Sequence, residues 1–493
     1  MAFLIWLRRH YFIGSLILIG LFTSILFILL GLNKNALGFP LDDAWIHQTY
    51  AKNLVALRSW SYTGAKISGG STSPLWTLLI SIGYLVSNKW GIVWTFLLSI
   101  SSFICLVVFA ILALQKLSGM ERNWKLLIPG VVIATEWHLL WGTASGMETI
   151  LYSLGVVLLF FVMLHDNINW LVVGILEGLL IWVRPDGLTL LGPIILIFIF
   201  ELQKKKGNWK NLSAFLFPFI LLLCAYFGFN YLTNGQFFPS TFYAKQVEYQ
   251  QLLTAPLSSR ILNEFSPIMT GAGVILLPGF LIEIWDSFRK KKYKAIGFIL
   301  WVLGFVILYA DRLPVIYQHG RYIFPVIAIY FILALAGVIK AIDAIHQSKT
   351  RNLLSMGWIG AILILSVSFY SIGIKTYRED LQAVNELMVQ PAQWVAENIP
   401  SNQIIAVHDI GAVGYFTQNP LIDLAGLVNS DVIPFMHDEK DLLNYMKTSG
   451  ASYFLGFSDW YSTSSSWGQM VKTFSVKYQA KQQEVIIIKL NAK

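Results

Sequence analysis

The sequence predicts a polytopic α-helical membrane protein, with about 11–13 membrane-spanning helices and a small C-terminal extracytoplasmic α/β domain. Three observations predict this class. Hydrophobic residues make up 56% of the 493 residues, whereas charged residues make up only 13%. The apolar residues form long uncharged runs, which are typical of helices that cross a bilayer. From about Thr376 these runs stop, and short strand-like segments alternate with helical ones.

The net charge of +9 is distributed unevenly along the chain. Residues 375–493 carry nine Lys and Arg against twelve Asp and Glu, which leaves 27 basic and 15 acidic residues before them. The basic excess lies mostly in short loops of the membrane portion, where the positive-inside rule places it. The charge therefore indicates contact with membrane lipids and does not indicate nucleic-acid binding.

The first apolar run, at 11–32, is too long for a signal peptide and lacks a small-residue cleavage site before Asn33. It predicts a retained span with Arg8 and Arg9 in the cytoplasm. Further apolar segments follow at 74–87, 90–114, 124–141, 147–164, 169–183, 187–202, 212–232, 267–285, 294–310, 322–342 and 353–374.

Twelve crossings would conflict with the charge rule, because the most basic loops would then lie outside the cytoplasm. Segment 74–87 has only 14 residues, short of the roughly 20 that a crossing needs, so we expect a half-crossing or interfacial helix. An odd number of crossings, eleven or thirteen, puts the tail outside. We therefore expect a transmembrane catalytic domain at 1–375 and an extracytoplasmic α/β domain at 376–493.

This topology gathers polar stretches on one outer face. The first outer loop, 33–73, contains a predicted amphipathic helix at 43–57, and further stretches lie at 141–148, 184–187, 233–266 and 311–321. In the tail, the pattern predicts helices at 391–398 and 438–448 and strands at 404–407, 421–424, 453–457 and 485–490.

Asp42 and Asp43 are adjacent carboxylates in the first outer loop. Such a pair can take a proton from an acceptor hydroxyl or hold a divalent metal ion. The alternative is structural, with Asp42 as the N-cap of helix 43–57 and Asp43 in its first turn. The two interpretations are compatible, because one carboxylate can cap a helix while the other faces a cavity.

A second candidate is His319-Gly320-Arg321-Tyr322 at the outer mouth of a later span. The guanidinium fork of Arg321 is suited to a phosphate group. The alternative is an interfacial anchor made of Arg and Tyr side chains. If the pattern is functional, we expect Arg321 to share one outer pocket with the two acids.

Other polar residues are predicted to line the same cavity. Glu148 starts a span, where its carboxylate either interacts favourably with the helix dipole or forms part of the polar wall of the site. Arg184 and Asp186 belong to an Arg-Pro-Asp-Gly sequence that predicts first of all a turn between two spans. Glu136 and Glu177 lie inside apolar runs, and we expect them to bond to neighbouring helices more than to a substrate.

Several short motifs follow one another along the chain. They are Asp42-Asp43, Ser71-Thr72-Ser73-Pro74, Gly146-Met147-Glu148-Thr149, Arg184-Pro185-Asp186-Gly187, His319-Gly320-Arg321-Tyr322 and, in the tail, His408-Asp409 to Gly414-Tyr415 and Asp423 to Gly426-Leu427. In this order they resemble the motifs of GT-C integral-membrane glycosyltransferases, which include protein O-mannosyltransferases, aminoarabinose transferases and mycobacterial arabinofuranosyltransferases. The tail looks like the external domain of the bacterial, arabinofuranosyltransferase-like branch.

The resemblance implies a polyprenyl-phosphate sugar as donor and a hydroxyl of a glycan, lipid or protein as acceptor. It implies catalysis on the non-cytoplasmic face of the bacterial inner membrane. By position, Asp42 or Asp43 would be the base, and Arg321, with His319, would hold the lipid phosphate. Glu148, Arg184, Asp186 and Tyr322 would line the substrate cavity. The resemblance leaves open whether a divalent metal binds at Asp42 and Asp43, and it implies no other cofactor.

Two other functions compete with this one. A lipid-linked sugar flippase would also need a polar cavity and a phosphate site, and Glu136 and Glu177 within the spans favour it. A non-catalytic envelope assembly protein would use the tail to bind a partner, with the acids only capping a helix. Under the enzyme hypothesis, Asp409, Tyr415 and Asp423 of the tail would help to admit the acceptor.

Overall fold

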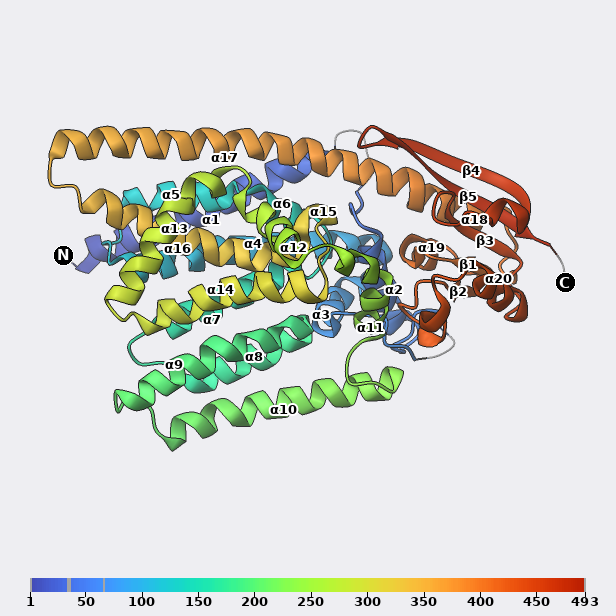
Figure 1. The fold of residues 1–493 in the computed structure, drawn as a ribbon, viewed down its shortest axis with the longest axis horizontal. Helices are drawn as coiled ribbons and strands as arrows, with labels where there is room; N and C mark the ends of the chain where they lie inside the picture. Colours follow the sequence, from blue (N-terminus) through green and yellow to red (C-terminus); the bar gives the residue numbers. More distant parts are fainter. Residues whose placement is uncertain (1, 33–36, 65–66, 492–493) are drawn as a thin grey trace.

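The structure is a computed structural model that describes residues 2–32, 37–64 and 67–491, with side chains from residue 11 onward. Parts of the predicted loop 33–73, and the side chains of Arg8 and Arg9, lie outside the described residues. A bundle of long helices forms one end of the molecule and a small sheet domain forms the other (Figure 1). This arrangement confirms the predicted class, a bundle of apolar helices with a small C-terminal α/β domain, whereas the 11–13 crossings and the outer location of that domain stay predictions.

Within the described residues, seven helices are long and apolar enough to cross a membrane, or nine if each of two bent pairs counts as one span. The seven comprise α1 (Ala2–Leu32), α4 (Asn88–Ser118), η2–α9 (Pro185–Gln203), α10 (Trp209–Asn234), α14 (Tyr293–Arg312), α15–α16 (Tyr317–Asp343) and the span that contains α17 (Ser348–Val384). Three shorter apolar helices accompany them: α3 (Pro74–Tyr84), α7 (Thr149–Met163) and α8 (Trp170–Val183).

The two bent pairs correct two predicted segments. Segment 124–141 divides into Trp124–Ala134, which contains α5 (Leu127–Ala134), and α6 (Trp137–Ala144), at an angle of 60°. The break lies at Glu136, whose carboxylate accepts the Leu139 N–H as the N-cap of α6 and contacts His138 at 2.7 Å. The second pair, α12 (Leu257–Phe265) with its 3₁₀ extension and α13 (Ala272–Arg289), is bent by 105°.

Two short helices lie between the bundle and the sheet domain (Figure 1). The predicted helix at 43–57 is α2 (Asp42–Ala56), which carries the acid pair in its first turn. The second is α11 (Ser240–Glu248), from the loop between α10 and α12. Because α2 buries eight consecutive residues, from Ala44 to Ala51, it is fixed on all sides and holds its first turn in a defined place.

The sheet domain contains five strands in the order β2-β1-β3-β5-β4. The strands are β1 (Ile405–Val407), β2 (Leu421–Asp423), β3 (Tyr453–Phe457), β4 (Gly468–Tyr478) and β5 (Lys481–Leu490), with helices α18 (Gln390–Asn398), α19 (Ile410–Phe416) and α20 (Glu439–Thr448). Strand β1 runs parallel to β2 and β3, and β5 runs antiparallel to β3 and β4. The four predicted strands and two predicted helices are present, whereas β4 and α19 were not predicted.

The proposed domain boundary at 375 falls inside α17, which continues through a π-helical segment (Asn385–Val389) into α18. This continuous helix runs the length of the bundle and reaches the sheet domain (Figure 1). The sheet domain is therefore joined to the bundle through a helix rather than a flexible linker.

A second connection runs through Asp42. The residue at the N-cap of α2 is Leu41, so Asp42 does not cap its own helix. Its carboxylate instead accepts the N–H groups of Gly411 at 2.6 Å and Ala412 at 2.8 Å, in the first turn of α19. Asp42 thereby satisfies two N–H groups that a helix start leaves unpaired, and it ties the sheet domain to α2.

Helix α19 can approach α2 this closely because it carries glycines at the contact. A Cβ on Gly411 would lie 2.0 Å from the Asp42 backbone oxygen, and one on Gly414 would lie 2.1 Å from the Tyr62 hydroxyl. The glycines of the tail motif are therefore required by the interface between the two parts.

Gly411→Ala is expected to lower the stability of the interface by about 1–3 kcal/mol, the typical cost of overpacking. Thermal unfolding of the detergent-purified protein, followed by tryptophan fluorescence, measures the effect. Gly360→Ala is the matched control, because a Cβ there meets no atom within 4 Å. Equal melting temperatures for the two variants would show that α19 does not depend on this contact.

Candidate active site

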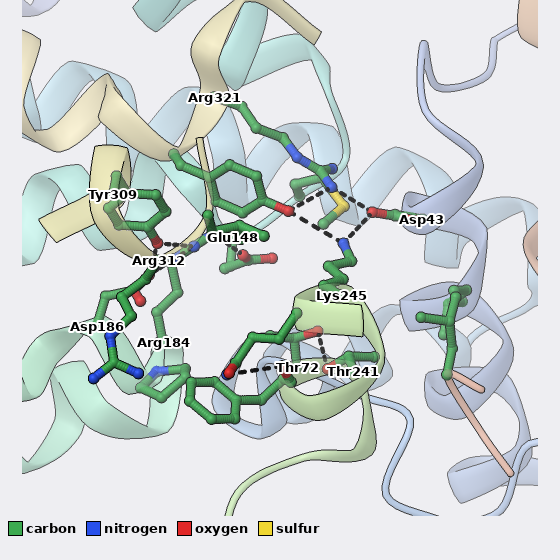
Figure 2. Close-up of a pocket in the computed structure, with 18 of the residues that line it drawn as sticks. Asp43, Thr72, Glu148, Arg184, Asp186, Thr241, Lys245, Tyr309, Arg312 and Arg321 are labelled. Carbon is green, nitrogen blue, oxygen red and sulfur yellow. Dashed lines mark hydrogen bonds and ion pairs between the residues drawn. The ribbon is translucent and has the colours of Figure 1, made fainter. Parts of the chain in front are cut away.

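A cavity of about 340 Å³ opens where α2 and α11 meet the ends of several bundle helices. Four cationic and three anionic side chains line it, so the charged groups sum to +1. They are Arg184, Lys245, Arg312 and Arg321, with Asp43, Glu148 and Asp186. Figure 2 shows these residues converging on the cavity from separate elements. Six of the eight predicted site residues line it, and Asp42 and His319 do not.

Asp43 is the carboxylate that faces the cavity. Its Oδ2 accepts from Nη2 of Arg321 at 2.5 Å and from Nζ of Lys245 at 3.2 Å (Figure 2). The hydroxyl of Tyr322 also lies 3.2 Å from the Lys245 ammonium. One carboxylate therefore holds together α2, α11 and the start of the α16 span, which are far apart in the sequence.

Arg321 reaches this position through an unusual turn. Gln318, His319 and Gly320 have φ angles of 56°, 62° and 65°, so three consecutive residues lie in the left-handed region. For residues other than glycine this conformation costs about 1–2 kcal/mol each, so it persists only where other contacts hold it. The His319 Nε2 lies 2.7 Å from the Asp380 carboxylate of α17, which supplies such a contact.

Asp380 is a buried anchor for this turn. Its carboxylate also accepts from the Trp141 indole at 2.8 Å and the Tyr478 hydroxyl at 2.6 Å. His319 therefore lies on the far side of the turn from the cavity, and its predicted contact with a phosphate stays a prediction.

Arg184 is held by a network on the opposite wall. Its guanidinium contacts Glu148 at 3.0 Å and Asp186 at 2.6 Å, and the Tyr309 hydroxyl donates to Asp186 at 2.7 Å. The Glu148 carboxylate is also 3.5 Å from Nε2 of His47, one turn after Asp43. The predicted turn at 184–187 is present, and it also presents two charged side chains to the cavity.

The site has hydrogen-bond donors that can still bind an anion. Arg321 is only 3% exposed, yet its Nε and Nη1 have no partner among the described residues. An unpaired donor in a buried guanidinium is costly, because such groups normally carry hydrogen bonds. The geometry favours a ligand with several acceptor oxygens, and phosphate has the matching shape.

The charges also set the ionisation of the site. Burial alone would raise the pKa of Asp43, but Lys245 and Arg321 hold this pKa well below its usual range. Burial alone would lower the pKa of Lys245, but the Asp43 carboxylate raises it. Burial alone would raise the pKa of Glu148, but His47 and Arg184 lower it to about 2. All three groups are therefore charged at neutral pH.

The acid pair does not fit a divalent metal ion in this arrangement. The Asp42 carboxylate is occupied by two backbone N–H donors and that of Asp43 by two cations, so the two do not converge on one point. No cluster of three or more His, Cys, Asp or Glu suited to a metal lies within the described part of the chain.

Sequence reasoning missed Lys245, His47 and Tyr309. Lys245 is the lysine of a short helix in the long loop 233–266, and nothing in its local pattern sets it apart from a solvated residue. His47 carries a weak signal, since it follows Asp43 by four residues and must share its helix face. Tyr309 looks like part of an aromatic belt.

The helix arrangement, with a sheet domain beyond one end, is similar to that of several solved structures and is GT-C-like. ArnT from Cupriavidus metallidurans bound to undecaprenyl phosphate has 12% identity and a TM-score of 0.62, covering 97% of this chain and 98% of that chain. The apo oligosaccharyltransferase of Archaeoglobus fulgidus has 13% identity and a TM-score of 0.64, covering 92% and 70%. Archaeoglobus fulgidus AglB with an inhibitory peptide and a dolichol-phosphate has 12% identity and a TM-score of 0.59, covering 91% and 69%. At sequence identities of 12–13%, the similarity to these structures establishes a shared fold and nothing more.

A family model described as a domain of unknown function (DUF8728) matches residues 367–487, which include the end of α17 and most of the sheet domain. No curated protein matches the chain by sequence.

Glu148→Gln is expected to destabilise the protein at pH 7 by about 3 kcal/mol, the value of a pKa shift from 4.5 to about 2. The folded-state pKa is depressed, so this contribution is complete well above pH 4.5 and is lost as the pH falls toward 2. The difference in unfolding free energy between wild type and variant should therefore shrink between pH 6 and pH 3. Glu397→Gln, at an exposed position, is the control. A difference that does not change with pH would contradict the assigned ion pairs.

Proposed function

We propose that this protein is an inverting membrane glycosyltransferase that moves a sugar from a polyprenyl-phosphate donor to a hydroxyl acceptor. The observation that carries the proposal is a cavity in which one carboxylate, Asp43, faces Arg321, Lys245 and Arg184. A base for a hydroxyl and cations for a departing phosphate are the groups that this reaction needs. Two solved structures with this fold hold undecaprenyl phosphate and dolichol-phosphate, which supports the same donor class here.

The reaction is a single displacement at the anomeric carbon. The acceptor oxygen forms a bond to that carbon as the bond from the carbon to the phosphate oxygen breaks. The electron pair leaves with the polyprenyl phosphate, and the acceptor proton passes to Asp43. Because attack and departure take place on opposite faces, the anomeric configuration inverts.

The free site holds Asp43 as a weak base, since two cations stabilise its charge. A lipid phosphate would compete for the same cations and draw Lys245 and Arg321 away from the carboxylate. Loss of these partners raises the basicity of Asp43. The base would thus become active only when a donor is present.

We place the cavity and the sheet domain on the non-cytoplasmic side of the bacterial inner membrane, with the transmembrane domain at 1–375. Asp42, Glu148, Asp186 and Tyr322 then act through position: Asp42 holds the sheet domain, and the others orient the cations. The sugar transferred stays open.

A flippase for lipid-linked sugars is the second candidate. The observation that favours it is Glu177, which is fully buried in α8 with neither carboxylate oxygen bonded. Glu136, the other residue that suggested transport, is a helix cap. The charged groups of the cavity gather at one end of the bundle, and this arrangement favours the transferase.

Asp43→Asn is expected to lower the transfer rate by about 10²- to 10⁴-fold, the range for loss of a general base. The purified protein is incubated with a bacterial membrane-lipid extract that contains polyprenyl-phosphate sugars and with an envelope extract as acceptor. Mass spectrometry measures the polyprenyl phosphate released. Asp166→Asn is the matched control, because Asp166 is exposed and does not line the cavity, and this variant should keep the wild-type rate. Full activity of Asp43→Asn would refute the base, and no release by the wild type would favour the flippase.

A further inference from the structure

A second cavity, of about 630 Å³, lies between the end of the bundle and the sheet domain. Asp43, Lys245 and Arg321 line this cavity as well as the first one. The ion-paired cluster therefore borders both cavities. A transfer between two substrates needs such an arrangement, because the base must reach the acceptor while the cations reach the donor.

The lining of the second cavity differs from that of the first. It combines aromatic side chains that have polar ends with carboxylates, amides and imidazoles. The aromatic group is Trp141, Tyr249, Tyr317, Trp460 and Tyr478. The polar group is Glu248, Gln318, His319, Asp380, His408, Asp409, Gln479 and Gln483. Flat rings with nearby carboxylates and amides fit ligands that alternate apolar faces with hydroxyl groups.

Several of these groups lack partners. Gln318 Oε1 and His408 Nδ1 are buried and accept or donate no hydrogen bond within the described part of the chain, although the Asp409 carboxylate lies 3.9 Å from His408 Nδ1. Trp460 is 47% exposed although it is a large aromatic residue, and its ring packs against His408 with centroids 4.6 Å apart. Buried polar atoms without a hydrogen bond, beside an open aromatic ring, favour a polar ligand in this cavity.

The backbone around this cavity is also irregular. The left-handed turn at 318–320 supplies Gln318 and His319, and the π-helical segment supplies Leu387 and Met388. Such π segments occur often at functional sites. The sheet domain contributes Trp460 and the hairpin tip between β4 and β5, so the cavity exists only when that domain is docked through Asp42.

We propose that the second cavity binds the acceptor, and that this acceptor is a carbohydrate chain. The inference rests on the proposed function and specifies its acceptor. The sheet domain supplies much of the polar lining, including His408, Asp409 and Trp460. Apolar residues such as Ile316, Leu387 and Met388 line the cavity too, and the aromatic rings that stand beside polar groups favour a carbohydrate over a lipid. The hydroxyl that reacts reaches Asp43 from this side, opposite the donor.

The proposal is tested with full-length protein in detergent and an array of purified bacterial envelope oligosaccharides, without any donor. The wild type should bind at least one oligosaccharide, and Trp460→Ala should bind it at least tenfold more weakly. Trp124→Ala is the matched control, since Trp124 is 68% exposed and lines neither cavity. Melting temperatures of the three proteins check that Trp460→Ala is folded.

Undiminished binding by folded Trp460→Ala, or no binding by the wild type, would overturn the proposal. Asp43→Asn separates this result from the proposed function, because it should still bind the oligosaccharide while it loses transfer. Transfer to a lipid or a peptide without oligosaccharide binding would reject the carbohydrate acceptor and leave the transferase intact. Oligosaccharide binding that depends on Trp460, in a protein with no transfer activity, would keep the binding site and reject the transferase.

Discussion

The contact on which the site depends is the Asp43 carboxylate shared between Arg321 and Lys245. These residues come from the first loop, the loop after α10 and the start of the α16 span, so the fold must bring three distant segments together. Burial makes each charge costly alone, and the pairing offsets that cost. The same pairing leaves the guanidinium of Arg321 with unpaired N–H groups and the carboxylate with little basicity. An anion that binds Arg321 would therefore weaken the ion pairs of Asp43 and raise the basicity of this carboxylate.

The two adjacent acids have separate tasks because successive residues at the start of a helix point in different directions. Asp42 is directed to the N-terminus of α19 and docks the sheet domain, whereas Asp43 is directed to the cations. A single turn of α2 therefore couples the position of the sheet domain to the position of the proposed base. This coupling explains why the second cavity and the ion-paired cluster share a wall.

Much of this arrangement was predictable from the residues themselves. Uncharged runs predicted the helical class, and the run at 74–87 predicted a helix too short to cross the membrane, which agrees with the 11 residues of α3. The meeting of Asp43 and Arg321 was predicted from order and sidedness alone. Lys245 was not, because its role comes only from where α11 docks. The break at Glu136 was missed because the residues on both sides are mainly apolar and continue the run. Strand β4 was missed because its exposed residues carry little strand pattern at a sheet edge.

A structure of the full-length protein with undecaprenyl phosphate bound, determined by electron cryo-microscopy, would show whether the donor phosphate takes the two cations away from Asp43. We expect the phosphate to lie within hydrogen-bonding distance of Arg321 and Lys245, with the Asp43 carboxylate released toward the second cavity. A phosphate bound elsewhere, with the contacts from Asp43 to both cations intact, would contradict this expectation.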